Sequence, residues 1–291
     1  MPTESTIACV ADVHAVLGEG PVWVAREAAL YWLDIKGRKI FRLDSQNVVT
    51  EWPTPMRVGS LVPRRKGGFL AGTENGIAEV DPPAGRFTII ADPETNLPEN
   101  RFNDGKLDRR GRFWAGTMDD LEKSATGTLY RIDPDLVVSP VDGGYRVTNG
   151  PAFSPDGTVM YHNDSALQTT YRFDLDPDGR LSNRGIFLKF KDGEGFPDGM
   201  TVDGEGCLWI AFWDGWSVRR YSPGGEWLES IRMPVARPTS CAFGGPGLDR
   251  LYITSASIGL DETAIAMQPN AGGLFMVEVG VRGIDDVPFP G

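Results

Sequence analysis

The feature that most restricts the fold of this chain is a series of six similar segments spread along its 291 residues. Each segment contains a short aromatic and aliphatic stretch, and the centres of these stretches are 39, 44, 47, 48 and 43 residues apart. Repeats of about 40–50 residues with several short strands each are typical of β-propeller blades. The sequence therefore predicts an all-β fold, a six-bladed β-propeller. The stretches are Leu30-Tyr31-Trp32, Phe69-Leu70-Ala71, Phe113-Trp114-Ala115, Met160-Tyr161-His162, Leu208-Trp209-Ile210 and Leu251-Tyr252-Ile253.

Each repeat also contains a second strand-like run, and turn clusters such as SPDG (154–157), DPDG (176–179) and SPGG (222–225) separate the runs. The N-terminal run TIACVAD (6–12) belongs to none of the repeats. We expect it to supply the outer strand of the last blade, where it would pair an otherwise exposed sheet edge. The second runs are residues 39–44, 76–81, 128–133, 169–176, 217–222 and 273–279.

No linker, low-complexity tract or change of composition divides the chain, so residues 1–291 are predicted to form a single domain. A two-sheet sandwich is the alternative all-β architecture, but it does not explain a regular period of this length. Cys9, Cys207 and Cys241 are far apart and form no CxxC pair, which argues against a disulfide framework and a zinc site.

Charge and hydropathy restrict the partners of the protein. Lys and Arg total 29 against 40 Asp and Glu, and the net charge of -11 disfavours nucleic acid and anionic membranes as partners. No apolar run approaches the ~20 residues that span a bilayer. The polar start of the chain lacks the pattern of a secretory signal. We therefore expect a cytoplasmic protein.

A candidate site follows from the position that lies 11 or 12 residues before the centre of each stretch. Equivalent positions in successive blades face the same axis. Four of the six carry carboxylate or carboxamide oxygens, which suit a hard divalent cation, and two of these four are charged. The sequence thus predicts a site for one divalent metal ion (Ca, Zn, Mg, Mn or Fe). The six positions are Glu19, Gly59, Asn103, Asn149, Asp198 and Ser240.

The alternative interpretation of the same residues is structural. Asn-Gly and Asp-Gly are common tight-turn dipeptides, so TNGP (148–151) and PDGM (197–200) could be turns in any β protein. The shared register favours the metal site. Asp156-Gly157 and Asp178-Gly179 lie outside that register, and we expect both to be plain hairpin turns.

Four segments resemble those of the SMP-30/gluconolactonase/regucalcin-like family: LGEGPVW (17–23), RFNDGKLDRRGRFWAGTM (101–118), TNGPAFSPDG (148–157) and FPDGMTVDGEGCLW (196–209). The resemblance extends over nearly the whole chain. It implies a six-bladed propeller that hydrolyses sugar-acid lactones. It further implies that Glu19, Asn149 and Asp198 are metal ligands, that Arg101 and Asn103 face the substrate, and that Asp198 doubles as a base.

The chain departs from the family after the GTM motif, where the family often has a substrate-contacting Glu. The aligned position holds Leu121, and the nearby acids are Asp119, Asp120 and Glu122. We assign the contact to Asp120, with the other two acids as alternatives. Residues 212–226 and 237–260 are similar to bacterial lactonases of sugar oxidation pathways. The resemblance therefore implies a pentono- or hexonolactone as substrate and an aldonic acid as product.

In the predicted mechanism, the cation polarises the lactone carbonyl and activates water, Asp198 accepts the proton, and Arg101 donates hydrogen bonds to the substrate. Two other functions stay open, a phosphotriesterase-like hydrolase and a non-enzymatic calcium-binding propeller. A Ser-His-Asp triad is disfavoured, because the chain has no GxSxG elbow and only two histidines, His14 and His162. We expect His162 to be a structural imidazole with its hydrogen bonds satisfied.

Overall fold

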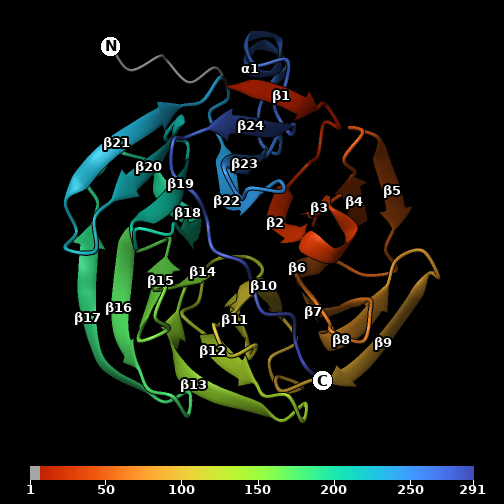
Figure 1. Ribbon diagram of the computed structural model, residues 1–291, viewed down its shortest axis with the longest axis vertical. Coiled ribbons are helices and arrows are strands. Elements are labelled where there is room, and N and C mark those ends of the chain that lie inside the picture. Colours follow the sequence, from red (N-terminus) through yellow and green to blue (C-terminus); the bar gives the residue numbers. More distant parts are fainter. Residues whose placement is uncertain (1–6) are drawn as a thin grey trace.

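A computed structural model, which describes residues 7–291, contains six four-stranded antiparallel sheets arranged as the blades of a ring (Figure 1). This confirms the predicted six-bladed propeller. Each aromatic or aliphatic stretch lies in the second strand of its blade, and each second run lies in the third strand. The period of the sequence is therefore the period of the blades.

The first three blades follow one another along the chain. Blade one contains β2 (Gly18–Val24), β3 (Ala29–Asp34), β4 (Lys39–Leu43) and β5 (Val49–Pro53). Blade two contains β6 (Val58–Pro63), β7 (Phe69–Thr73), β8 (Gly76–Asp81) and β9 (Arg86–Ala91). Blade three contains β10 (Asn100–Leu107), β11 (Phe113–Asp119), β12 (Gly127–Ile132) and β13 (Val138–Tyr145).

The second half of the ring has the same order, except in its last blade. Blade four contains β14 (Thr148–Phe153), β15 (Val159–Asp164), β16 (Thr169–Leu175) and β17 (Leu181–Lys189). Blade five contains β18 (Phe196–Val202), β19 (Leu208–Trp213), β20 (Ser217–Tyr221) and β21 (Trp227–Arg232). Blade six contains β22 (Pro238–Gly244), β23 (Arg250–Ser255), β24 (Leu274–Glu278) and, at its outer edge, β1 (Ala8–Ala11).

The ring is closed by β1, as the sequence predicts. It pairs antiparallel with β24, with Ala8 opposite Met276 and Cys9 opposite Phe275. The expected strand covered residues 6–12, and residue 6 lies outside the described residues. Because β1 and β24 come from opposite ends of the chain, their pairing joins the first and last parts of the fold without a covalent link.

The hydrophobic core lies between the blades. Six clusters of buried apolar side chains are present in residues 7–291, and each combines residues of two adjacent blades. Alternating side chains of each sheet pack against the facing sheet, which is why the second strands are rich in large apolar residues. Trp32, Trp114 and Trp209, all from second strands, are fully buried in these layers.

An Asp-centred turn recurs between the first and second strands of blades three and five. Asp108 accepts hydrogen bonds from the main-chain N–H of Arg110 and Arg112 and from Trp114 Nε1. Asp203 accepts the equivalent hydrogen bonds, from the main-chain N–H of Glu205 and Cys207 and from Trp209 Nε1 at 2.9 Å. The repeated Asp thus fixes the turn and orients the buried tryptophan. The hairpins expected at Asp156-Gly157 and Asp178-Gly179 are confirmed, with Gly157 N–H and Gly179 N–H each closing a turn.

Two segments depart from the simple ring. A short helix, α1 (Glu262–Met267), is inserted between β23 and β24, and one turn of 3-10 helix spans Ala25–Glu27. The C-terminal segment, residues 282–291, crosses one face of the ring from blades five and six to blades two and three (Figure 1). Along residues 7–291, no helix is long and apolar enough to cross a membrane.

Candidate functional site

The four oxygen-bearing residues predicted from the register all lie on innermost strands. Glu19 is on β2, Asn103 on β10, Asn149 on β14 and Asp198 on β18. All four are buried, and all four line one cavity of about 540 Å³ at one end of the central channel. The structure thus brings together residues that lie up to 179 positions apart in the chain.

A local irregularity explains how these side chains reach the axis. The pairing of the first and second strands shifts register once in every blade, at or beside the position that the sequence singles out. A β-bulge bends a strand and redirects its side chains, and bulges are common next to active sites. The repeated bulge therefore turns a polar side chain toward the channel in blades one, three, four and five.

Blades two and six contribute no acid or amide at this register. A Cβ atom on Gly59 would lie 2.4 Å from the main-chain oxygen of Asn103, so β6 packs too closely on β10 for a side chain. Ser240 is fully buried, and neither Ser240 nor Gly59 lines the cavity. The oxygen set is therefore confined to blades one, three, four and five.

Hydrogen bonds connect the two carboxamides. Asn103 Nδ2 donates to Asn149 Oδ1 at 3.0 Å and to the main-chain oxygen of Thr148 at 2.8 Å. Asn149 Nδ2 donates to Ser165 Oγ at 2.8 Å. These hydrogen bonds hold both amides in a single orientation. Asn149 itself lines the cavity.

The carboxylates of Glu19 and Asp198 repel each other. Burial, followed by the charge of Asp104, raises the pKa of Glu19 from 4.5 to about 8. Burial, and then the charges of Glu19 and Asp104, raises the pKa of Asp198 well above its ordinary value. Burial raises the pKa of Asp104 as well. Three buried carboxylates thus act on one another in the channel, and a cation would relieve their repulsion.

The chemistry of this donor set fits a hard divalent cation. Carboxylate and carboxamide oxygens are the ligands that Ca²⁺ and Mg²⁺ prefer, and the charges of Glu19 and Asp198 balance two positive charges. Across residues 7–291 no three His, Cys, Asp or Glu side chains gather into a metal-binding cluster. A site here would therefore depend on Asn149 as well as on the acids.

Arg101 is held beside the carboxamides by three hydrogen-bonded contacts. Its Nε donates to Asp120 Oδ1 at 2.7 Å, and its Nη1 donates to Asn103 Oδ1 at 2.7 Å and to the main-chain oxygen of Phe102 at 3.1 Å. The Nη2 group makes no hydrogen bond within residues 7–291. Because Arg101 lines the cavity, Nη2 supplies two N–H donors for a bound molecule.

Asp120, which the sequence assigned to substrate contact, lies behind Arg101. Arg57 Nη1 donates to both of its carboxylate oxygens at 2.8 and 2.7 Å, and Lys36 Nζ lies 3.2 Å away. Although burial opposes ionisation, the hydrogen bonds from Arg57 and Arg101 lower the pKa of Asp120. Asp120 is not among the residues that line the cavity, and its observed contacts position Arg101.

The acid that does line the cavity in this loop is Glu122. Its backbone is left-handed, with φ of 57°, and the carboxylate of Asp119 accepts hydrogen bonds from the main-chain N–H groups of Leu121, Lys123 and Ser124. Asp119 therefore organises the loop, and the tight turn presents Glu122. Counting positions from the GTM motif left Glu122 as one of three candidate acids, because a turn breaks the alternation of a strand.

The mouth of the cavity combines charged and aromatic side chains. Lys36 and Arg146 line it, and Arg146 donates to the main-chain oxygens of Glu122 and Lys123 without an ion pair to any described carboxylate. Phe196 and Trp213 line it as well, and Arg237 stacks on the Trp213 ring at 4.9 Å. Such a surface can contact both the hydroxyl groups and the apolar faces of a small polyol.

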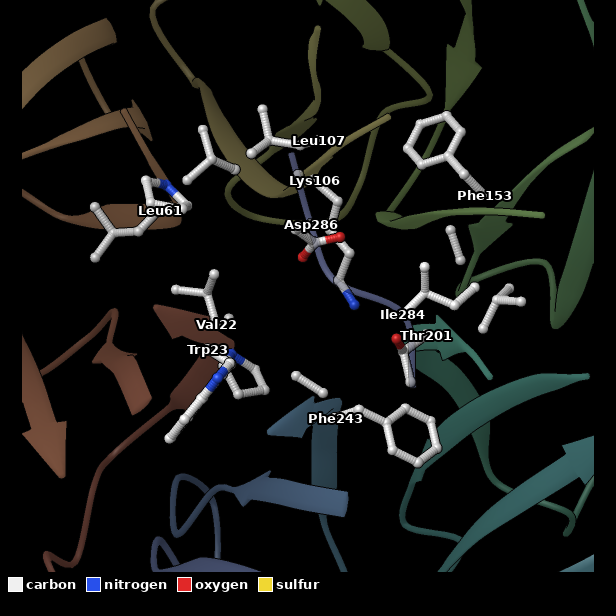
Figure 2. A pocket seen from close by; sticks show the side chains of 18 of the residues that line it. Val22, Trp23, Leu61, Lys106, Leu107, Phe153, Thr201, Phe243, Ile284 and Asp286 are labelled. Atoms are coloured by element: carbon white, nitrogen blue, oxygen red, sulfur yellow. The ribbon is translucent and has the colours of Figure 1, made fainter. Parts of the chain in front are cut away.

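Asp104 and Lys106 lie just beyond the oxygen set on β10 and were not predicted as site residues. Both line a second, smaller cavity at the opposite end of the channel, beneath the C-terminal segment (Figure 2). Asp104 follows Asn103 directly, and both residues lie in the bulge. The signal that could have identified it is the bulge itself, since a bulge lets two successive side chains face the channel.

His162 lines neither cavity, and one expectation about it was wrong. The imidazole is fully buried against the ring of Tyr145, at 4.6 Å, but neither ring nitrogen has a hydrogen-bond partner among the described residues. Burial, followed by the charge of Arg184, lowers the pKa of His162 to about 3. A neutral imidazole in an aromatic environment needs less compensation than a charged one.

Comparisons with known proteins agree with the geometry. Residues 17–257 match the family described as the SMP-30/Gluconolactonase/LRE-like region. The chain is 38% identical to 6-deoxy-6-sulfogluconolactonase of Pseudomonas putida, over 98% of this chain and 99% of that protein. It is 36% identical to L-arabinolactonase of Azospirillum brasilense, over 97% and 95%. Among solved structures, a calcium-binding regucalcin from Agrobacterium tumefaciens superposes with a TM-score of 0.93 at 28% identity, covering 99% and 97%.

Proposed function

The chain belongs to the SMP-30/gluconolactonase/LRE-like family and is a lactone-hydrolysing enzyme, and from this premise we propose that it opens a pentono- or hexonolactone to the aldonic acid with one divalent cation. The names of two relatives, an L-arabinolactonase and a 6-deoxy-6-sulfogluconolactonase, support sugar lactones as the substrate class. The proposal covers both five- and six-carbon lactones.

The observation that carries the proposal is the convergence of Glu19, Asn149 and Asp198 on the floor of one cavity next to Arg101. We assign the three residues as cation ligands, with Asn103 and Arg101 facing the substrate. Asp120 acts on the substrate through Arg101, whose orientation it holds at 2.7 Å. A bound cation would polarise the lactone carbonyl and lower the pKa of water.

The residues of the chain account for the proton transfers. Asp198 accepts a proton from the water that attacks the carbonyl carbon. The ring C–O bond then breaks, and the same proton passes from Asp198 to the ring oxygen as it leaves. Burial, and then the charges of Glu19 and Asp104, raise the pKa of Asp198 in the metal-free chain, and a bound cation would lower it again. The free N–H groups of Arg101 hydrogen-bond to the carbonyl oxygen or to a sugar hydroxyl.

Exhaustive chelation tests the cation requirement. We expect chelated protein to lose lactone hydrolysis, measured as acid release above spontaneous opening, and a divalent cation to restore it. Glu19→Gln should weaken cation binding, because it removes one of two charged ligands. Glu51→Gln on the exposed outer strand β5 is the matched control and should change nothing. Full activity in protein verified to be free of metal would contradict the proposal.

A substrate panel tests the lactone class. L-Arabinonolactone, gluconolactone and 6-deoxy-6-sulfogluconolactone should be compared by kcat/KM, together with a phosphotriester. We expect at least one sugar lactone to be hydrolysed far faster than the phosphotriester. Preference for the phosphotriester would favour the phosphotriesterase-like alternative instead.

A further inference from the structure

A second cavity lies behind the floor of the lactone cavity, at the opposite end of the channel. Its volume is about 50 Å³, and it is lined by Asp104 and Lys106 of β10 together with residues of the other inner strands. Ile284 and Asp286 of the C-terminal segment cover it, and Figure 2 shows the Lys106 side chain extending across the channel beneath them. The two charged groups are therefore close to the proposed cation site but face away from the mouth.

Asp104 is connected to one of the proposed ligands through the main chain. It is 3% exposed, and its carboxylate accepts hydrogen bonds from Gly105 N–H at 2.7 Å and from Gly150 N–H at 2.8 Å. Gly150 is the residue after Asn149, so Asp104 fixes the strand that presents the Asn149 amide. Its negative charge also acts directly on Glu19 and Asp198.

Lys106 places a positive charge in the same channel. Its Nζ donates to the main-chain oxygen of Met200 on β18 and to that of Cys241 on β22, the latter at 3.3 Å. Within residues 7–291 no carboxylate lies within ion-pair distance of Lys106, and the charge of Asp286 above it is paired with Arg109 at 3.3 Å. The charge of Lys106 lowers the pKa of Glu19 and of Asp104, against the effect of burial.

The net charge of the buried groups in this part of the channel matches that of a divalent cation. Glu19, Asp104 and Asp198 together carry three negative charges when ionised, and Lys106 carries one positive charge. Two negative charges remain. On the basis of the cation site in the proposed function, we propose that Asp104 and Lys106 set the affinity and the charge preference of that site, with Lys106 restraining it to divalent ions.

Calorimetric titration with Ca²⁺ and with La³⁺, ions of similar size but different charge, tests the proposal without reference to activity. Lys106→Met should tighten Ca²⁺ binding by roughly tenfold. It should tighten La³⁺ binding by about 30-fold, because the interaction energy scales with the charge of the ion. Asp104→Asn should act in the opposite direction and weaken Ca²⁺ binding by about 10–100-fold, as is usual for residues that support metal ligands.

Two further variants separate charge from structure. Lys106→Gln keeps a donor for the carbonyl oxygens and should behave like Lys106→Met if charge is the cause. Lys189→Met is the matched control. Lys189 Nζ also donates to a main-chain oxygen, that of Leu167, but Lys189 lies on the outer strand β17, away from the channel. We expect no change in either affinity for Lys189→Met.

The outcomes distinguish this inference from the proposed function. Equal shifts for Ca²⁺ and La³⁺, or no shift in Lys106→Met and Lys106→Gln while the parent protein binds Ca²⁺, would overturn the role of Lys106. A parent protein that binds neither ion would overturn the cation site itself. The inference would be supported if both Lys106 variants bind the two ions more tightly, with a larger gain for La³⁺ than for Ca²⁺, and if Asp104→Asn binds Ca²⁺ more weakly.

Discussion

Asp198 is the residue on which a ligand role and a base role coincide. If it only holds the cation, Asp198→Asn should regain most activity at saturating cation, because an amide oxygen still coordinates. If it is also the base, saturation will not help, since an amide cannot accept the proton, and kcat should fall by about 10²–10⁴-fold. We expect the second result. The measurement is kcat at saturating cation, corrected for spontaneous opening, beside Asn149→Ala. A kcat within a few-fold of the parent would rule out the base role.

Single residues show how far sequence reasoning extends into the site. Glu19, Asn103, Asn149 and Asp198 could be grouped in advance, because equivalent positions of a propeller share an axis. Asp104 could not, and Glu122 was only one of three alternatives. Asp104 faces the channel only because a bulge adds an extra residue to β10, and Glu122 reaches the cavity only through a left-handed turn. Both depend on local backbone geometry that the periodicity of the sequence does not contain.

At the scale of the strand, the close approach of β6 and β10 makes a test of packing. A Cβ atom on Gly59 would lie 2.4 Å from the Asn103 oxygen and 2.5 Å from the Phe102 oxygen, both main-chain atoms. Gly59→Ala should therefore lower the free energy of unfolding by about 1–3 kcal/mol and disturb Asn103. Urea denaturation measures it. In Gly185→Ala the nearest atom is 3.9 Å away, so this control should match the parent protein. Equal stabilities would show that β6 can shift freely.

The strands themselves were the most predictable level of the structure. The six second strands and six third strands were located from their aromatic content and the turns between them, because β-branched and aromatic residues bounded by Gly, Pro and Asp carry strong local preferences. The helix α1 was not anticipated. It has six residues with none buried, so it lacks the apolar face that periodicity would detect.

For the molecule as a whole, stability should depend on pH in a direction set by the channel. The pKa of Glu19 is about 8 in the folded chain against an ordinary value of 4.5, so between these values the folded chain holds a proton that the unfolded chain releases. The free energy of unfolding of metal-free protein should therefore fall as pH rises from about 6.5 to 8. Below that range the lowered pKa of buried His162 acts in the opposite direction, because the unfolded chain then holds a proton that the folded chain lacks. The pKa of Asp198 is shifted in the same direction as that of Glu19. Carboxyls with lowered pKa, such as Asp120, titrate below this range.

Calorimetric Tm values in chelator, measured from pH 6.5 to 8.5, check this dependence. The rise in Tm on adding Ca²⁺ should grow over the same range, because the cation displaces those protons. Glu19→Gln should flatten the slope in chelator, whereas Glu51→Gln should leave it unchanged. A Tm that rises with pH in the metal-free parent protein would contradict the charge arrangement described for the channel.

The C-terminal segment affects how substrate can enter the channel and how product can leave it. Arg65 N–H donates to the Phe289 oxygen and Phe289 N–H donates to the Pro63 oxygen, so the segment is anchored to blade two after crossing the far end of the channel. Phe289 is fully buried among residues of blades two and three. The segment therefore covers the end of the channel opposite the cavity lined by Glu19 and Asp198. If the proposed lactone and the aldonate formed from it both pass through the open cavity, the product competes with the substrate for entry, and initial rates should fall as aldonate is added.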